Sequence, residues 1–402
     1  MKICVICGYI FLSLNKKKMT DNLSKPLKIM VVAGEASGDL YGAHLAKELK
    51  EINPEISLVG LGGSKMKEMG VEIFFDPTPL SVVGLSGILK NFPVFISLLS
   101  KVKSYLGQVK PDALILIDSP EFNMRLLDFA SKLKIPTFYY FSPTVWAWRA
   151  NRAKRIAGSK TKILSIFPFE KEAYRKAGCD VIFVGHPMLD IVKTSLSKKE
   201  ACQRFGLDPQ KPVIGLLPGS RKKEVSNLLP TMVKAAKLIK SSFPDAQFLL
   251  PLASTLSRDD LEPYYSFLPS PSFLIEEEKY EGLKVCDLAI IASGTATLEA
   301  AILGVPMIII YKVNWIEEAV AKRVLKTKFI GLPNIVAGRR IVVELLQERA
   351  NPLAISKVAL SWLNKKESLE RIKLELSKVR EKLGEEGAVR RAARAVIRYA
   401  SP

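Results

Sequence analysis

One local pattern occurs twice in this 402-residue chain, about 260 residues apart: an apolar strand, a short glycine turn and a helix. The first copy covers 28–49, with KIMVVA, the turn GEASG and an amphipathic helix. The second covers 288–300, with LAIIA, the turn SGTAT and a helix. A helix N-terminus leaves backbone N–H groups unpaired and carries partial positive charge, so each turn is predicted to bind an anion or a polar substrate group.

Apolar runs alternate with helical patterns along the whole chain, which predicts βαβ units and parallel sheets. Strands are expected at 28–33, 56–59, 113–117, 137–140, 163–166 and 181–184, and, after a restart at Pro212, at 213–217, 248–250, 272–274, 288–292 and 307–311. The predicted fold class is therefore α/β, with two Rossmann-like domains whose parallel sheets face a central cleft. The expected parts are a disordered extension at 1–24, domains at 25–205 and 206–365, and C-terminal helices at 366–402 that pack back on the N-terminal domain or on a partner.

The first 14 residues (MKICVICGYIFLSL) are apolar and are followed by lysines at 16–18. They imitate a signal peptide, but a small-residue cleavage site does not follow, and the run is too short to span a bilayer. We interpret them as a dispensable extension upstream of Met19; a short membrane anchor is the alternative.

Composition narrows the classes of partner. With 60 basic and 40 acidic residues the chain has a formal charge of +20, which favours a polyanion: nucleic acid, an anionic membrane surface or a phosphorylated substrate. Five scattered cysteines are typical of a reducing cytosol. Only two histidines are present, so a multi-histidine metal site is excluded and no metal is predicted.

Phosphate-binding groups are expected at two strand ends of the second half. The segment 217–221 (LPGSR) puts Arg221 at a sheet edge, where a guanidinium can bind a diphosphate through two parallel hydrogen bonds. The turn 293–297 comes from another strand end of the same sheet, and Glu299 is placed to accept ribose hydroxyls. An ordinary loop with a solvated arginine and tight helix–sheet packing are the alternatives. Together the two segments favour a nucleoside diphosphate.

Carboxylates are expected at the strand ends of the first half. Asp118 follows the buried strand 113–117, at the edge where open α/β sheets build their sites, and is a candidate general base. A helix-capping aspartate is the alternative. Glu35 lies inside the first glycine turn, which favours binding of hydroxyls or amides there rather than phosphate.

Three other segments have structural interpretations beside functional ones. The segment 138–156 mixes aromatic and basic residues, which could stack on single-stranded nucleic acid, but a core strand followed by a basic helix is favoured. The segment 60–65 (GLGGSK) lacks P-loop spacing and is predicted to be a plain turn. The apolar segment 80–106 fits buried helices or, with its lysines, a surface that dips into anionic lipid.

Taken together, these residues resemble the lipid A disaccharide synthase family, which has the glycosyltransferase B fold. The resemblance covers 28–397 and is carried in order by VAGEASGDLYG (32–42), IDSPEFN (117–123), SPTVWAWRANRAKR (142–155), FPFE (167–170), VGHP (184–187), LPGSRKKEV (217–225), SGTATLEA (293–300), LPNIVA (332–337) and ELLQ (344–347). It implies transfer of 2,3-diacylglucosamine from UDP to the 6-hydroxyl of 2,3-diacylglucosamine 1-phosphate. Because UDP is a good leaving group, one carboxylate suffices as the base, in contrast to the two of a glycosidase.

The resemblance also implies the roles of individual residues. Asp118 would be the catalytic base and Glu35 would help to position the acceptor. The substrate-binding residues would be Gly34, Ser37, Gly38, Arg221, Ser293, Gly294, Thr295, Thr297, Glu299, Asn334, Glu344 and Gln347. No metal or cofactor is implied. The enzyme would be cytoplasmic, bound peripherally to the anionic inner face of the cell membrane, and a homodimer that exchanges C-terminal segments is compatible with the family.

Two positions depart from the family pattern: Gly87 stands where an acidic residue is usual, and Val343 where a proline is usual. The first departure concerns acceptor or membrane contacts, and the second concerns the role of Glu344. The alternatives are another UDP-sugar glycosyltransferase with a lipid acceptor, a UDP-sugar epimerase and a basic nucleic-acid-binding protein. No nucleic-acid motif supports the last, so no nucleic-acid partner is predicted.

Overall fold

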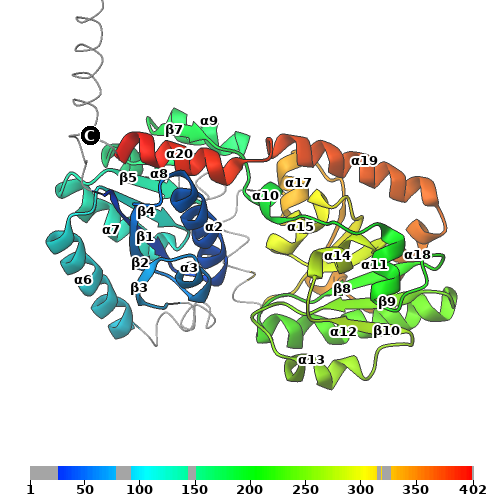
Figure 1. Cartoon of the computed structure of the whole chain (residues 1–402). Helices are drawn as coiled ribbons and strands as arrows, with labels where there is room; N and C mark the ends of the chain where they lie inside the picture. The colour runs from blue at the N-terminus through cyan, green and yellow to red at the C-terminus, as the bar shows by residue number, and fades with distance from the viewer. Residues whose placement is uncertain (1–25, 78–91, 144–150, 315–317, 319–326, 401–402) are drawn as a thin grey trace, which may run out of the picture.

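The computed structural model describes residues 26–77, 92–143, 151–314, 318 and 327–400. They form two lobes, each built on one parallel β-sheet with helices packed around it (Figure 1). The strand order is β3-β2-β1-β4-β5-β6-β7 in the first sheet and β10-β9-β8-β11-β12-β13 in the second. The tryptophans of 144–150 and residues 80–91 of the apolar segment 80–106 lie outside the described residues.

The strands of the first sheet are β1 (Lys28–Ala33), β2 (Ser57–Leu61), β3 (Glu72–Phe75), β4 (Ala113–Ile117), β5 (Thr137–Tyr140), β6 (Lys162–Ser165) and β7 (Asp180–Phe183). Those of the second are β8 (Val213–Leu217), β9 (Gln247–Pro251), β10 (Ser272–Ile275), β11 (Leu288–Ala292), β12 (Met307–Tyr311) and β13 (Val343–Leu346). Every predicted strand is present within two residues of its expected bounds, whereas β3 and β13 were not predicted.

The helices around the first sheet are α2 (Ala36–Ile52), α3 (Ser64–Glu68), α6 (Phe92–Val109), α7 (Pro120–Lys132), α8 (Asn151–Gly158) and α9 (Pro168–Lys176). The short helix α10 (Met188–Ile191) lies where the chain passes to the second lobe and contacts α15 and α20. Those that follow are α11 (Lys198–Arg204), α12 (Lys222–Ser242), α13 (Arg258–Tyr265), α14 (Lys279–Lys284), α15 (Thr295–Ile302), α17 (Leu332–Ala337), the 3-10 turn η1 (Gln347–Arg349), α18 (Pro352–Leu363), α19 (Lys366–Lys382) and α20 (Ala388–Ala400). Among the described residues, none of these helices is long and apolar enough to cross a membrane.

The central strands are buried on both faces, as is usual for parallel sheets covered by helices. In β4 all five residues are fully buried: Leu114 and Leu116 pack into one core, and Ile115 and Ile117 pack into the other. Full burial of one such side chain contributes roughly 1.5–3 kcal/mol. The strand is therefore a rigid support for the residues that follow it.

The chain crosses between the lobes twice, between β7 and α10 and again between α19 and α20 (Figure 1). Helix α19 packs on α15 and α17 of the second lobe, and α20 packs on α2 of the first. At the second crossing the His186 N–H donates to the Leu383 carbonyl oxygen at 2.9 Å, and the Asp190 carboxylate accepts from the Val389 N–H at 2.9 Å. The C-terminal helices thus join the two lobes within one chain.

Candidate active site

Asp118 begins the loop after β4 in a backbone conformation that is unusual for an aspartate. Its φ is +48°, and that of Ser119 is +38°, both in the left-handed region. Such a conformation costs on the order of 1–3 kcal/mol for a residue other than glycine and persists where the surroundings enforce it. Here the Asp118 carbonyl oxygen accepts hydrogen bonds from Asn123 Nδ2 at 2.8 Å and from the Tyr139 hydroxyl at 2.9 Å.

This conformation brings the Asp118 side chain to the first glycine turn. The Gly34 N–H donates to Asp118 Oδ1 at 3.4 Å. A Cβ atom at Gly38 would lie 2.1 Å from Asp118 Oδ2, and one at Gly34 would lie 2.0 Å from Ser119 Oγ. Glycines are therefore needed at 34 and 38, where the loop after β4 comes close to the turn. The anion next to the amide of Gly34 is the Asp118 carboxylate and not a bound ligand.

The surroundings of the Asp118 carboxylate favour its protonated form. Burial, followed by the nearby Glu35 carboxylate, raises the pKa of Asp118 well above its usual value, and the nearby Ser119 hydroxyl and the amides of Gly34 and Gly38 oppose this rise. Oδ2 is buried and accepts no hydrogen bond. A carboxylate with raised pKa and one uncommitted oxygen is suited to accept a proton.

The other glycine-rich turn of the first lobe is also filled by a carboxylate. Asp39 is buried, and its oxygens accept from the N–H groups of Gly63 (2.7 Å), Lys65 (3.1 Å) and Met66 (3.1 Å). The segment 60–65 is a strand-to-helix turn between β2 and α3, as predicted. Its amides serve to bind Asp39.

Glu35 and Arg221 link the two lobes. Arg221 Nη2 lies 3.9 Å from Glu35 Oε2, and its Nη1 lies 3.4 Å from Glu224 Oε1. The side chains of Arg221 and Glu35 are 51% and 44% exposed, so this pair contributes little to stability. Its importance is geometric, because it brings an arginine from the edge of the second sheet to the glycine turn of the first.

The second glycine turn is open. Gly294 and Thr295 are exposed at the start of α15, and a Cβ atom at Gly294 would meet no atom within 4 Å. Below them, the Thr297 hydroxyl donates to the Gly294 carbonyl oxygen at 2.7 Å and the Ser293 hydroxyl donates to that of Ile330 at 3.1 Å. The first amides of α15 are therefore accessible to an anion.

Glu299 is buried behind this turn and already has partners. Its Oε1 accepts from Lys279 Nζ at 3.0 Å and from the Tyr280 hydroxyl at 3.4 Å. Burial and the Glu299 charge raise the pKa of Tyr280, so its hydroxyl stays protonated and donates. Burial, then Glu299, then Asp118 raise the pKa of Tyr41 on α2, so carboxylates of both lobes lie near one tyrosine.

Asn334, Glu344 and Gln347 mainly hold the loops around the second sheet edge. Asn334 Nδ2 donates to Glu344 Oε1 at 2.8 Å, and the Glu344 carboxylate accepts from the N–H groups of Ile330 and Gly331. The side-chain amide of Gln347 makes two hydrogen bonds with the backbone of Val313. Asn334 and Glu344 thus support the loop whose Ile330 carbonyl oxygen accepts the Ser293 hydrogen bond. Contact of Asn334, Glu344 and Gln347 with a ligand stays a prediction.

Neither histidine is placed as an alternative base. Burial lowers the pKa of His186 to about 3, and its Nδ1 accepts from the Met188 N–H at 3.2 Å. Burial and two nearby lysines lower the pKa of His44. The hydrogen bonds of Tyr139 and Asn123 to Asp118 are not predicted from the sequence: Tyr139 is predicted as core, and the only hint for Asn123 is its place in IDSPEFN.

Solved structures of other proteins share this architecture. UDP-GlcNAc 2-epimerase from Neisseria meningitidis, bound to UDP-GlcNAc, superposes with a TM-score of 0.63 at 15% identity and covers 92% of this chain and 100% of that one. A glycosyltransferase from Rickettsia africae superposes with a TM-score of 0.55 at 12% identity, covering 94% and 99%. Two Rossmann-like domains in the glycosyltransferase B arrangement, predicted from the sequence, are confirmed.

Sequence comparisons are more specific. The lipid-A-disaccharide synthase of Trichlorobacter lovleyi is 44% identical over 375 residues, which cover 93% of this chain and 98% of the relative. That of Geobacter metallireducens is 42% identical over 370 residues, covering 92% and 96%. The family model for lipid-A-disaccharide synthetase matches residues 29–398, which include both glycine turns, Asp118 and Arg221. The chain therefore belongs to the lipid-A-disaccharide synthetase family.

Proposed function

We propose that this chain transfers 2,3-diacylglucosamine from UDP to the 6-hydroxyl of 2,3-diacylglucosamine 1-phosphate, which gives lipid A disaccharide 1-phosphate and UDP. Family membership makes it a hexosyltransferase of lipid A biosynthesis. The single observation that supports these substrates most strongly is the cross-lobe contact. The 3.9 Å approach of Arg221 to Glu35 puts a cation from the edge of the second sheet next to the turn that receives the Asp118 carboxylate.

In the proposed mechanism Asp118 is the base. Its Oδ2 takes the proton of the acceptor 6-hydroxyl while that oxygen attacks the anomeric carbon of the donor, and the bond from this carbon to the diphosphate breaks. One displacement inverts the configuration and gives a β-linkage. The raised pKa of Asp118 fits this role, because a more basic carboxylate takes up the proton more readily. Glu35 would orient the acceptor sugar from the same turn.

The donor would bind at the edge of the second sheet. Arg221 and the first amides of α15, with Ser293, Gly294, Thr295 and Thr297 around them, would hold the diphosphate and stabilise the charge that develops on it. Glu299 would accept a ribose hydroxyl, and Asn334, Glu344 and Gln347 would complete the site. The diphosphate would take the place of Glu35 beside Arg221.

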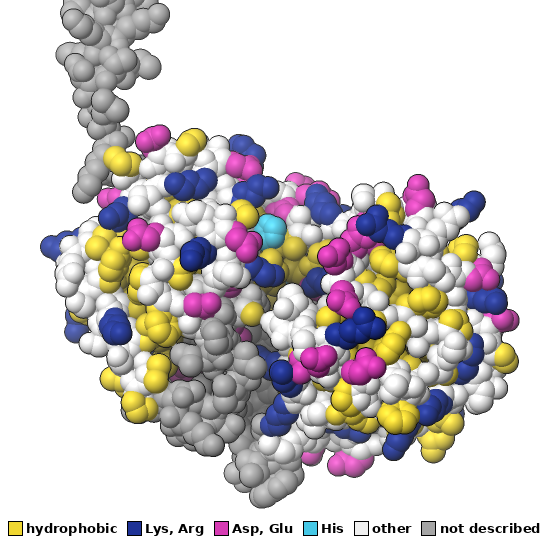
Figure 2. All heavy atoms as spheres, turned by 60° about the horizontal axis from the view of Figure 1, so that its bottom comes forward, with side chains coloured by type: hydrophobic (Ala, Val, Ile, Leu, Met, Phe, Trp, Pro, Cys, Tyr) yellow, Lys and Arg dark blue, Asp and Glu magenta, His cyan; other side chains and the backbone are white. Residues whose placement is uncertain are grey.

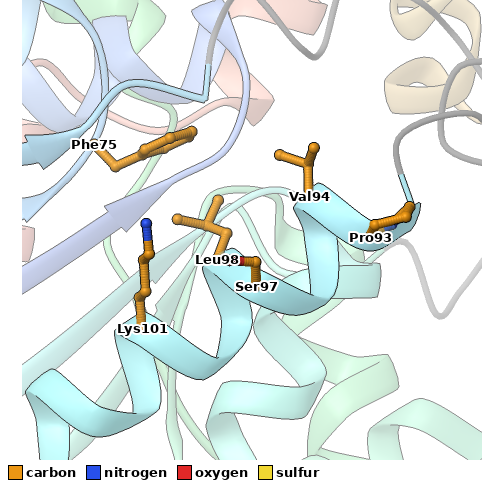
Figure 3. A pocket seen from close by; sticks show the side chains of 6 residues that line it. All are labelled: Phe75, Pro93, Val94, Ser97, Leu98 and Lys101. Atoms are coloured by element: carbon orange, nitrogen blue, oxygen red, sulfur yellow. The ribbon is translucent and has the colours of Figure 1, made fainter.

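The substrates carry acyl chains, and we propose that the first lobe rests on the anionic inner face of the cell membrane. Phe74, Val94 and Ile96 are 37%, 41% and 44% exposed at the end of β3 and the start of α6. Next to them lies a cavity of about 320 Å³, lined by Phe75, Pro93, Val94, Ser97, Leu98 and Lys101 (Figure 3). Apolar side chains beside a lysine suit a surface that meets lipid headgroups.

An assay with purified protein tests the proposal. Given UDP-2,3-diacylglucosamine and 2,3-diacylglucosamine 1-phosphate, it should release UDP and form the disaccharide without added metal, and Asp118→Asn should lower kcat by orders of magnitude. Absence of product with every natural acyl length would exclude this reaction. Transfer to another lipid acceptor would favour the alternative of a different UDP-sugar glycosyltransferase. On the face in Figure 2 basic and acidic side chains are interspersed, so the overall charge of +20 does not form one basic patch there for nucleic acid.

A further inference from the structure

Two buried side chains with no role in the proposed mechanism converge on the main chain at Asp118. Asn123, from the first turn of α7, donates through Nδ2 to the carbonyl oxygens of Ile117 (3.0 Å) and Asp118 (2.8 Å). Tyr139, from the neighbouring strand β5, donates its hydroxyl to the Asp118 carbonyl oxygen at 2.9 Å. Both side chains are fully buried.

We propose that Asn123 and Tyr139 are positioning residues for the transfer reaction: their hydrogen bonds hold Asp118 in the left-handed conformation that directs its carboxylate to the turn 34–38. This inference rests on the proposed function, in which Asp118 is the base. It adds two residues that touch neither substrate and act through the orientation of Asp118.

The Asp118 carbonyl oxygen lies just past the end of a strand. β4 ends at Ile117, so the Asp118 carbonyl oxygen lies beyond the last parallel pair with β5, which joins Ile117 to Tyr140. Asp118 and Ser119 both adopt positive φ without being glycine, and the three hydrogen bonds from Asn123 and Tyr139 offset this unfavourable conformation. If Asp118 returned to an ordinary conformation, its carboxylate would leave Gly34.

The use of the Asn123 side chain points the same way. Its Nδ2 makes both of these bonds, whereas its Oδ1 is buried and accepts none. A buried asparagine that contributed only to stability would be expected to use both its NH₂ group and its side-chain oxygen in hydrogen bonds. In Asn123 only the NH₂ group has partners. These partners are the carbonyl oxygens of Ile117 and Asp118, the groups just before and just after the Asp118 Cα atom.

Tyr140 offers a matched control for Tyr139. The two tyrosines are adjacent on β5 and fully buried, but the Tyr140 hydroxyl has no hydrogen-bond partner. Tyr139→Phe and Tyr140→Phe each remove one buried hydroxyl and keep the ring. Only the first change removes a bond to Asp118.

The test compares kinetics and backbone amides in the two variants. We expect Tyr139→Phe to lower kcat roughly tenfold, as loss of one buried hydrogen bond would, with the KM for the UDP sugar within twofold, and Tyr140→Phe to keep kcat within twofold. In protein labelled with ¹⁵N-glycine, the Gly34 and Gly38 amide resonances should move in Tyr139→Phe and stay in Tyr140→Phe. Asn123→Ala should lower kcat further; if it does not fold, the tyrosine pair decides alone.

An equal fall of kcat in both tyrosine variants, or unmoved Gly34 and Gly38 resonances in Tyr139→Phe, would overturn the inference. A different result would show that the proposed function, and not this inference, is wrong. If Asp118→Asn kept wild-type turnover, Asp118 would not be the base, while the glycine resonances would still report whether Tyr139 orients its carboxylate.

Discussion

Replacement of Gly38 by alanine tests how closely the position of Asp118 is set. The new Cβ atom would lie 2.1 Å from Asp118 Oδ2 and 2.8 Å from its Cγ, so the carboxylate must withdraw by about 1 Å to reach an ordinary contact. A displacement of about 1 Å in a reacting group can lower a rate roughly 100-fold. We therefore expect Gly38→Ala to lower kcat by about two orders of magnitude, while UDP affinity changes little because Arg221 and α15 belong to the other lobe.

The matched control is Gly107→Ala in α6, where a Cβ atom would meet nothing within 4 Å. Alanine is favoured over glycine inside a helix by about 1 kcal/mol, so this variant should be slightly more stable and equally active. UDP release measures kcat, and thermal unfolding confirms that both variants are folded. A folded Gly38→Ala protein with the kcat of Gly107→Ala would show that the contact between Asp118 and the turn has no role in the reaction.

Three further predictions concern the charge of Asp118, the diphosphate and the membrane. Burial and Glu35 raise the folded-state pKa of Asp118, so kcat/KM should fall as the pH drops through that raised value. For the same reason the contribution of Asp118 to stability is present below its unfolded pKa of about 3.9 and is lost as the pH rises through the folded pKa. Asp118→Asn should thus unfold at a higher temperature than wild type at neutral pH, and a lower one would contradict the sign of the shift. Arg221→Ala should weaken UDP binding roughly tenfold in calorimetry, whereas Lys222→Ala, whose lysine pairs with Asp260, should not; equal affinities would remove Arg221 from the donor site. Ile96→Ser should reduce sedimentation with anionic vesicles more than Leu374→Ser, which changes an exposed position on α19. High salt should weaken the electrostatic contribution to vesicle binding in both variants. Equal binding by the two variants would place the membrane contact elsewhere.

The fold could be predicted from the sequence because its central strands are long apolar runs between turns. β4 is entirely buried, and its five apolar residues are easy to recognise. The two missed strands lie at sheet edges and lack such a run: β3 (EIFF) alternates between exposed and half-buried residues, and β13 (VELL) contains Glu344. The domain boundaries at 205 and 365 stay predictions.

The candidate site could be predicted only in part. Asp118, Glu35 and Arg221 were found because each follows a strand near a turn. Asp118 accepts hydrogen bonds from Tyr139 and from a turn 84 residues away in the sequence, and no local pattern encodes such contacts. The pairing of Arg221 with Glu35 likewise depends on how the lobes are arranged. Long-range geometry, not residue type, separates what was predicted from what was not.

The most direct test of the account is a structure of this chain with UDP bound. The two glycine turns look alike in the sequence, but one already receives the Asp118 carboxylate and the other is open. We predict that the diphosphate contacts Arg221 and the first amides of α15, with Asp118 across the cleft from it. A diphosphate bound at Gly34–Gly38, or Arg221 still paired with Glu35 while UDP is bound, would contradict the proposed division between acceptor and donor sites.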